Sequence, residues 1–452
     1  VCSTAVLIGA GRELSWGPEQ DAAFEALPLP RLIGYASGLN ENLQRPFMRN
    51  AVQYFDVMTV RARRRLELSM PQVDERKILE INQRYREKHA GIFGSVADLD
   101  PDNPLKTGES DTRLPAGVFL DYDCTNLAVA CLGLLPASSR NELWSEVPFR
   151  HPSKVVVRYD LRNVPFEQDS IQDIEQLVRS LGQGFLKPRS SKTRDKDLDR
   201  YGLDYLAADI TLDLQDAAVL QRLRETYQKP VHLFWKLFKL QLLGVKHWST
   251  DVKKSLRDDR FQGHVKKPLK GKLPLSVVEL WMSDGSRAAS IDDLSDGETQ
   301  LLHTLGAVRL FSEEQALFIF DEPETHLNPS WRTRYHLDFE RAKQGLEMSQ
   351  ALVSSHSPFL ISSLSRDAVF QFQKANGCTV MEPPADETFG ASFEVLIKKF
   401  FGLKTAISQT AVDEITHQLH GAGLDIAAKR EWIEQHLGES LEKVYLLKKL
   451  EV

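Results

Sequence analysis

The chain has 452 residues, of which 42% are hydrophobic and 27% charged, a balance typical of globular domains that excludes a disordered or fibrous protein. Lys and Arg total 57 against 63 Asp and Glu, so the net charge of −6 excludes a global basic field for nucleic acid. The four cysteines lack CxxC spacing, the longest apolar run (residues 127–135) is far shorter than a bilayer span, and no basic leader opens the chain. We therefore expect about two or three domains in a cytoplasmic protein without zinc, disulfides or a membrane anchor.

Two short apolar runs near the start, residues 4–8 and 31–35, predict strands of a sheet. Residues 36–44 follow the second run and read as a loop. Four arginines in the five positions 61–65 then come after an aromatic-rich segment. Such a cluster suits phosphate contacts, although a charge run is more often the solvated face of a helix, and both readings stay open.

Residues 115–120 predict a strand, and a helix follows over residues 125–135. Between them, Asp121 and Asp123 form a DxD pair, which can bind Mg²⁺ and is the rival metal site of this chain. We prefer Asp123 as the N-cap of the helix, because no partnering acidic motif stands at a nearby strand end.

The middle of the chain predicts strands over residues 154–160 and 204–214, with a helix over residues 169–181 between them. Two helices broken near Pro230 follow within residues 215–244, and the second is apolar nearly all round. Such a helix is expected to be buried in a core or against another subunit.

The strongest basic patch occupies residues 246–272, where nine Lys or Arg, from Lys246 to Lys272, stand against three Asp. Contact with a partner or with nucleic acid explains such a patch as well as plain solvation does. Nucleic acid is therefore a candidate partner for this segment.

A strand over residues 275–282 and a hairpin turn lead to the sequence LSDGE at residues 294–298. Ser295 is expected to be the N-cap of a helix that runs from Glu298 to residue 311. The Ser295 hydroxyl, the Gly297 amide and the helix dipole would then face a phosphate.

An apolar strand over residues 316–320 ends in two carboxylates, Asp321 and Glu322. An apolar run without polar alternation is typical of a parallel strand covered on both faces, and ligands sit outside the carboxyl ends of such strands. One of two neighbouring acids can hold Mg²⁺ through its water shell while the other orients and deprotonates an attacking water. A second apolar strand, residues 351–353, has a polar tail that presents His356 at the same sheet edge.

Together, LSDGE, the strand with its Asp-Glu end and the histidine resemble the second half of an ABC-type ATPase head, with signature motif, Walker B motif and switch histidine. The continuation over residues 322–329 resembles the RecF, OLD and SMC-related cytosolic branch, and within it the ABC ATPases of bacterial restriction and anti-phage systems, including the Septu ATPase. Each motif alone is common, whereas all three in this order are specific.

The resemblance implies a role for each residue of the Walker B and switch motifs. Asp321 would hold Mg²⁺ through water, and Glu322 would act as general base on the hydrolytic water. His356 would contact the γ-phosphate of ATP.

The resemblance also implies a second subunit. Ser295, Gly297 and Glu298 would complete the nucleotide site of an opposite subunit, so that ATP joins two heads and hydrolysis releases them. Gln44 is the nearest candidate for the glutamine that touches Mg²⁺ after a strand of such heads, with a neighbouring asparagine as the alternative.

A phosphate-binding loop with the pattern G-x-x-x-x-G-K-[ST] is required by this chemistry, because its amides and lysine cradle the phosphates. The sequence contains no such pattern. We expect the loop to lie upstream of Val1, since its loss would remove the reason to keep Glu322, His356 and LSDGE together.

Beyond His356, residues 369–372 predict a last strand, residues 388–392 open a helix to residue 401, and residues 405–450 are amphipathic helix. No DxD or HNH pattern follows, so any cleavage activity would belong to a separate protein.

The predicted fold class is α/β, an ABC ATPase head with a mostly parallel sheet flanked by helices, a mixed α/β insertion and a helical C-terminus. We expect four parts, listed here in order: residues 1–135, the first part of the head; residues 136–272, the insertion; residues 273–403, the rest of the head; and residues 404–452, the C-terminal helices.

The predicted function is that of an ATPase, with ATP and Mg²⁺ as cofactors. It would form at least a homodimer around ATP and regulate a separate effector, a nuclease or toxin protein, in bacterial anti-phage defence. One alternative is a DNA repair or recombination ATPase that clamps DNA with residues 246–272, and another is a catalytically silent scaffold.

Overall fold

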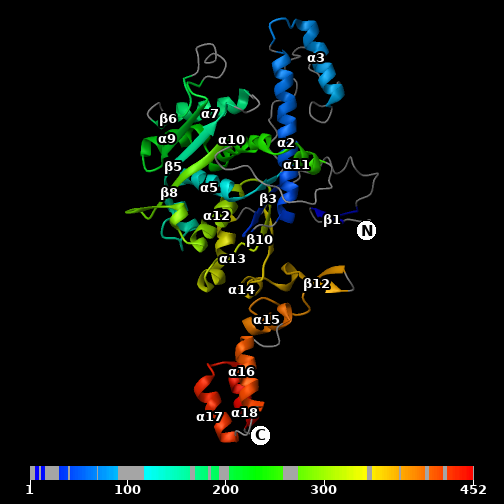
Figure 1. Cartoon of the computed structure of the whole chain (residues 1–452), viewed down its shortest axis with the longest axis vertical. Helices are drawn as coiled ribbons and strands as arrows, with labels where there is room; N and C mark the ends of the chain where they lie inside the picture. Colours follow the sequence, from blue (N-terminus) through cyan, green and yellow to red (C-terminus); the bar gives the residue numbers. More distant parts are fainter. Residues whose placement is uncertain are drawn as a thin grey trace. The chain divides into compact units, whose positions relative to one another are not determined.

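The computed structural model of the protein describes residues 6–9, 12–15, 30–38, 41–68, 70–89, 117–162, 168–181, 185–192, 203–257, 273–343, 349–375, 378–402, 407–420 and 425–450. They fall into two compact units, residues 1–356 and residues 357–452 (Figure 1). No helix within these stretches is both long and apolar enough to cross a bilayer.

The first unit contains a four-stranded sheet in which every neighbouring pair of strands is parallel. In spatial order the strands are β11 (Gln350–Ser354), β10 (Ala316–Asp321), β3 (Arg31–Ala36) and β4 (Gly117–Phe119). Asp321 lies opposite Ser354 of β11 and Ala36 of β3. The carboxyl ends of three strands therefore meet at one edge, and the predicted α/β fold class with a parallel sheet flanked by helices is confirmed.

Aromatic side chains hold one face of β10 against a helix. Phe318 and Phe320 are buried and pack edge-on against Phe339 of α13 (Pro329–Lys343). Burial of each ring contributes about 2 kcal/mol to folding. Helix α12 (Asp296–Phe311) packs against α13, and α12 also packs against α5 (Tyr122–Cys131). This packing fixes the position of β10 and therefore of Asp321 at its end.

The other face of the sheet is covered less completely than the apolar sequence of its strands predicts. Leu317 and Ile319 of β10 are partly exposed within the described residues. Leu352 of β11 is 59% exposed, because β11 forms one edge of the four described strands. The prediction that β10 is covered on both faces is therefore wrong for the described part of the chain.

A second, five-stranded sheet in the first unit is antiparallel throughout. In spatial order its strands are β6 (Leu186–Pro188), β7 (Ala207–Asp213), β5 (His151–Asp160), β8 (Leu275–Ser283) and β9 (Ala288–Ser290). β8 pairs with β5 from His151 opposite Ser283 to Tyr159 opposite Leu275, across the predicted boundary at residue 272. The division of the chain into four parts stays a prediction.

Helix α10 (Pro230–Leu242) lies in the core of the first unit. Its break from α9 (Ala217–Tyr227) and its burial were both predicted, because Pro230 occupies the first turn and the helix is apolar on most sides. Phe234 stacks on Phe238 of the same helix, and Phe234 also meets Phe311 of α12 edge-on. The first unit also contains α6 (Ala137–Leu143), α7 (Gln168–Leu181) and α11 (Thr250–Arg257).

Helix α2 (Glu41–Leu68) is long and pairs at its far end with α3 (Glu75–Lys88), as Figure 1 shows. The buried Arg64 guanidinium of α2 donates to the Asn82 side chain of α3 at 2.9 and 2.6 Å. Arg61 is also buried, whereas Arg63 is exposed, so the arginine cluster is only in part a solvated face. Its best-defined role among the described residues is to join two helices.

The first two strands lie outside both sheets. β1 (Val6–Gly9) pairs antiparallel with β2 (Arg12–Ser15) in a hairpin. The prediction that residues 4–8 contribute a strand to the larger sheet is therefore wrong. The backbone of β1 forms its hydrogen bonds with β2, the next strand in the sequence, and not with the parallel sheet.

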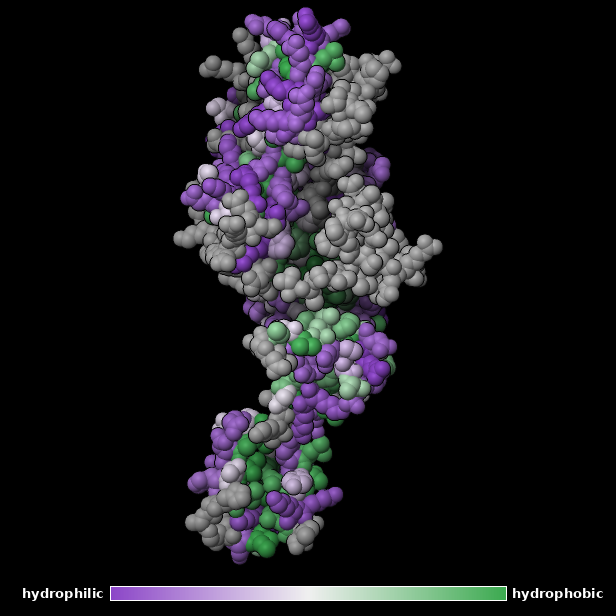
Figure 2. Space-filling model, turned by 90° about the vertical axis from the view of Figure 1, so that its right-hand side faces the viewer, coloured by the Kyte–Doolittle hydropathy of each residue, from purple (hydrophilic) through white to green (hydrophobic). Residues whose placement is uncertain are grey.

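The second unit begins with α14 (Pro358–Ile361), and its strands β12 (Gln371–Ala375) and β13 (Cys378–Glu382) form an antiparallel hairpin rather than the predicted last strand of the sheet. The remaining helices are α15 (Phe393–Phe401), α16 (Gln409–His420), α17 (Ile426–His436) and α18 (Leu441–Leu450). They confirm the helical C-terminus. Apolar side chains, Leu441 and Tyr445 among them, are exposed on these helices, and Figure 2 shows apolar surface there.

Candidate functional site

Asp321 is the last residue of β10 and lies at the open edge of the parallel sheet. The Ser354 hydroxyl donates to its Oδ1 atom, and the Ser37 amide donates to its backbone oxygen at 3.1 Å. The ends of β3, β10 and β11 thus meet at Asp321, whose residue is partly exposed to solvent and whose carboxylate is bonded by Ser354. A carboxylate in this position can serve as a ligand for a hard cation.

Glu322 leaves the strand with a backbone φ of +48°, in the left-handed region that residues other than glycine rarely adopt. Such a conformation costs about 1 kcal/mol or more. Its amide still donates to the Ser354 carbonyl at 2.9 Å, so the parallel pairing continues while the chain turns. The strained turn points the Glu322 carboxylate in a different direction from that of Asp321.

The Glu322 carboxylate is held on both oxygens. Oε1 lies 3.3 Å from His356 Nε2, and Oε2 accepts a hydrogen bond from the Thr325 hydroxyl at 3.0 Å. The His356 side chain is 80% exposed and that of Glu322 is 37% exposed, so both can reach a ligand. The structure therefore brings together the two side chains that the sequence predicts as catalytic.

Glu324 is a site residue to which the sequence analysis assigned no role. It is 3% exposed, its Oε1 accepts a hydrogen bond from the Ser355 hydroxyl, and its Oε2 has no partner among the described residues. Burial raises the pKa of the Glu324 carboxyl above its usual value, and the nearby Glu322 charge acts in the same direction. In the sequence, Glu324 is marked only by the tripeptide Glu-Pro-Glu, and this spacing does not predict that its side chain is buried.

Three consecutive residues at the end of β11 pair with the acids at the end of β10. Ser354 pairs with Asp321, Ser355 with Glu324 and His356 with Glu322. Because each pair joins the ends of two parallel neighbours, a shift of either strand end would break all of them together.

The sequence LSDGE forms a capping box at the start of α12. The Glu298 amide donates to Ser295 Oγ at 3.3 Å, and the Ser295 amide donates to Glu298 Oε2 at 2.9 Å. The predicted N-cap is confirmed, and the helix begins at Asp296, two residues earlier than predicted. Ser295 is exposed, whereas Gly297 is buried. A second molecule can therefore reach the Ser295 hydroxyl directly.

Gly297 marks a close approach between α12 and the segment that follows Glu322. A Cβ atom at Gly297 would lie 2.9 Å from the His326 carbonyl oxygen and 3.2 Å from the Trp331 ring. The His326 amide also donates to the Gln300 side chain of α12 at 2.8 Å. The LSDGE helix and the acidic strand end are thus packed against each other within one chain.

Gln44 lies in the first turn of α2, not in the loop that was predicted after β3. The loop is shorter than expected because Leu43 and Phe47, four residues apart, start an apolar helix face, and Phe47 is buried. Whether Gln44 contacts a metal stays a prediction.

One acid of the DxD pair is the N-cap of a helix, but it is Asp121 and not the predicted Asp123. Asp121 Oδ1 accepts from the amides of Asp123 and Cys124 at 3.1 and 3.0 Å, so Asp121 is the N-cap of α5 and the assignment of Asp123 was wrong. The described stretches hold no cluster of three or more His, Cys, Asp or Glu suited to a metal. Mg²⁺ usually takes only one or two carboxylates and fills its shell with water and phosphate.

The basic patch is described only up to Arg257. Helix α11 packs against α2, where the Arg257 guanidinium pairs with the Asp56 carboxylate at 2.7 Å. Residues 258–272 lie outside the described residues, and nucleic-acid contact by this segment stays a prediction.

Comparison with known proteins gives two matches. Residues 176–362 match the family described as "AAA domain, putative AbiEii toxin, Type IV TA system". Over 135 residues the chain is 26% identical to protein ea59 of Escherichia phage lambda, a match that covers 28% of this chain and 25% of that protein. The chain therefore spans about a quarter of that relative's length. The matched stretch contains LSDGE, both strand-end acids and His356, so this part of the chain is similar to an AAA domain.

Proposed function

We propose that this chain binds and hydrolyses ATP with Mg²⁺, as one half of a dimer that controls a separate effector in bacterial anti-phage defence. The observation that carries the proposal is the meeting of Asp321, Glu322 and His356 at the ends of two adjacent parallel strands. The match to an AAA domain supports the ATPase chemistry.

The strand-end acids fit Mg²⁺ by their chemistry, since carboxylate oxygens are its preferred protein ligands. Asp321 would hold the ion through water, with its second oxygen oriented by the Ser354 hydroxyl. When bound, Mg²⁺ supplies positive charge that neutralises the phosphate oxygens of ATP. The negative charge of Asp321 matters before binding too, because it attracts the cation to the edge of the sheet.

Glu322 is positioned to accept a proton. The Thr325 hydroxyl fixes Oε2, and His356 lies beside Oε1, so the carboxylate keeps one orientation toward the open edge. A water molecule that donates to Glu322 Oε1 would lose its proton to that atom as it attacks the γ-phosphorus, while the bond from that phosphorus to the bridging oxygen breaks and ADP leaves. His356, on the next strand, would hold the transferred phosphate in line with that water.

The second half of each site would come from another copy of the chain. Ser295 is exposed at the positive end of α12, where the helix dipole suits a phosphate. Its hydroxyl donates to Glu298 Oε2 at 2.7 Å and would turn to the phosphate when the second copy binds. Gly297 is buried against His326, so in each copy a movement of the segment after Glu322 would move the start of α12. This arrangement would couple hydrolysis to separation of the two copies.

A role in defence through a separate effector rests on the family description, which names a toxin of a toxin–antitoxin system. Under this proposal the effector is a separate protein, a nuclease or a toxin. The resemblance to the Septu ATPase supports the same arrangement, in which one protein hydrolyses ATP and another is the effector.

The deciding experiment replaces Glu322 by Gln in the full chain and measures ATP binding, ATP turnover and dimer lifetime with Mg²⁺. We expect nucleotide binding to persist while turnover falls about a hundredfold or more, because Gln cannot take a proton. The ATP-bound dimer should live correspondingly longer. Glu340→Gln, an exposed position on α13, is the matched control. Wild-type turnover in Glu322→Gln would refute the assignment of the base.

A further inference from the structure

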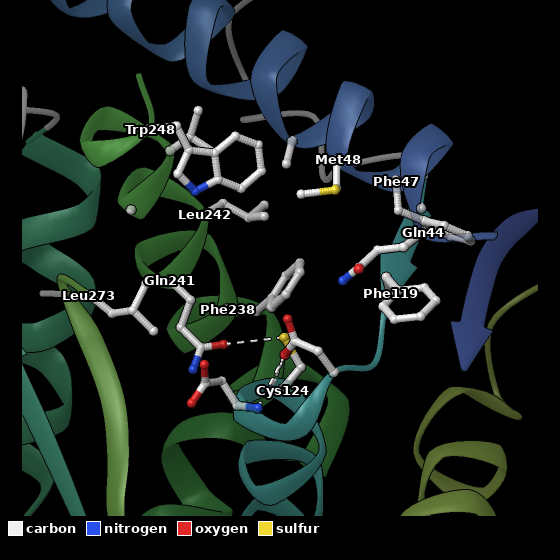
Figure 3. A pocket seen from close by; sticks show the side chains of 16 residues that line it. Gln44, Phe47, Met48, Phe119, Cys124, Phe238, Gln241, Leu242, Trp248 and Leu273 are labelled. Atoms are coloured by element: carbon white, nitrogen blue, oxygen red, sulfur yellow. Dashed lines mark hydrogen bonds between the residues drawn. The ribbon is translucent and has the colours of Figure 1, made fainter. Parts of the chain in front are cut away.

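A cavity of about 110 Å³ lies in the first unit, between the start of α2, the end of β4, α10 and the turn that follows α10. Figure 3 shows its lining residues. Its volume is of the order of the cavities that hold a single benzene ring. Neither the strand-end acids nor LSDGE contributes to its walls, whereas Gln44, the candidate magnesium-contacting glutamine, does.

The walls of the cavity are mainly apolar, and four of the lining residues are aromatic. Phe47 of α2 and Phe119 of β4 tilt against each other with ring centroids 5.6 Å apart. Phe238 of α10 and Trp248, which follows the turn after α10, line the other side of the cavity (Figure 3). Rings in this arrangement offer faces and edges on which a flat ligand can stack.

One wall carries an unused hydrogen-bond donor. The Gln241 side chain is 7% exposed, and its Oε1 accepts a weak hydrogen bond from Cys124 Sγ at 3.7 Å. Its Nε2 atom is buried without a partner among the described residues. A buried donor without an acceptor has lost its hydrogen bonds to water without compensation, and a ligand with an acceptor would relieve that loss.

The remaining polar groups restrict the charge of a ligand. Asp121 and Asp123 contribute carboxylates to the lining, and these repel anions. Gln44 extends its side-chain amide toward Phe238 in Figure 3 and adds one donor group and one acceptor. Because most of the lining is apolar, the cavity suits a neutral, flat molecule with an acceptor for Gln241, and its two carboxylates disfavour phosphates and carboxylates.

We propose that this cavity binds a neutral single-ring nitrogen heterocycle, of the chemical class of the pyrimidine bases and nicotinamide. The ring stacks among Phe47, Phe119, Phe238 and Trp248, and its carbonyl or ring nitrogen accepts from Gln241 Nε2. Because the cavity wall includes the first turns of α2, which follows β3 in the chain, an occupant fixes that helix to α10.

The test is calorimetric titration of the full chain with cytosine and nicotinamide, with benzene as the apolar probe. We expect saturable binding of at least one heterocycle, weakened about tenfold or more by Gln241→Leu, while benzene binding changes less than about twofold. Ala51→Leu fills the cavity and should abolish binding of the heterocycle, whereas Ala62→Leu, on the same helix outside the lining, should not.

Three outcomes would overturn the proposal: neither heterocycle binds, benzene binds as tightly as the better heterocycle, or Gln241→Leu and Ala51→Leu leave heterocycle binding unchanged. If Gln241→Leu fails to fold, the comparison of Ala51→Leu with Ala62→Leu decides alone. Each readout is independent of ATP, so a failure of the proposed ATPase activity would not affect it.

Discussion

At the scale of single residues, the site depends on acids placed in unlike surroundings. Asp321 and Glu322 are partly exposed and keep charge available for a cation and a water. Glu324, two residues on, is buried beside Ser355, and its pKa is raised by burial. Neighbouring acids therefore differ in burial although they share one turn of chain.

The Glu324 carboxyl is expected to make stability fall as the pH rises. Its folded pKa lies above the unfolded value, so its contribution is present below the unfolded pKa and is lost as the pH rises through the folded pKa. Glu324→Gln, which is always neutral, should lose less stability between pH 5 and pH 8 than the wild type, by urea unfolding. Equal pH dependence in the two proteins would contradict a raised pKa.

His303, buried in α12, should have the opposite dependence. Burial lowers its pKa to about 4, and its Nε2 lies 3.1 Å from the Asn126 side-chain oxygen. The unfolded chain takes up a proton near pH 6.5 while the folded chain does not, so stability falls with the pH from about 6.5 towards 4, by up to about 3 kcal/mol. Urea unfolding at pH 7 and pH 5 measures this loss.

The control for His303 is His303→Gln, which cannot be protonated. The difference in unfolding free energy between the two pH values should shrink in this variant by about 2 kcal/mol. An unchanged difference would show that other groups cause the acid sensitivity.

At the scale of elements, α12 connects the capping box to the acidic strand end. Its buried residues pack on α5 and α13, and its first turn packs on the backbone of His326. Helix and segment are packed too closely for either to move alone, because carbonyl oxygens cannot yield as flexible side chains do.

Gly297→Ala tests this connection. The new Cβ would lie 2.9 Å from the His326 carbonyl oxygen, so the segment after Glu322 must shift. We expect a stability loss of about 1–3 kcal/mol and, under the proposed function, a fall in ATP turnover of about tenfold or more. The matched control is Gly438→Ala, where nothing lies within 4 Å of the new atom. Unchanged melting temperature and turnover in Gly297→Ala would show that the contact is slack.

At the scale of the whole molecule, two sheets of different construction share the first unit. The parallel sheet carries the strand-end acids, and the antiparallel sheet includes β8, which leads through β9 into α12. Helix α10 packs against α12 as well as against β8 and so fixes one sheet relative to the other. The second unit holds its own hairpin and the last helices.

The sequence by itself determined the local features of this protein. An apolar run that ends in Asp-Glu predicted β10, Pro230 predicted the start of α10, and Ser295 with Glu298 predicted the cap of α12. Each of these depends on residues within a few positions of one another, so the physical cause can be read from the sequence.

Only the tertiary structure decided which distant residues meet. The pairing of Glu324 with Ser355 and the exposure of Leu352 both depend on strand register or sheet order. Register between segments is set by the packing of whole faces, and no short stretch of sequence contains that information. The acids were therefore predictable as a set, whereas their different surroundings were not.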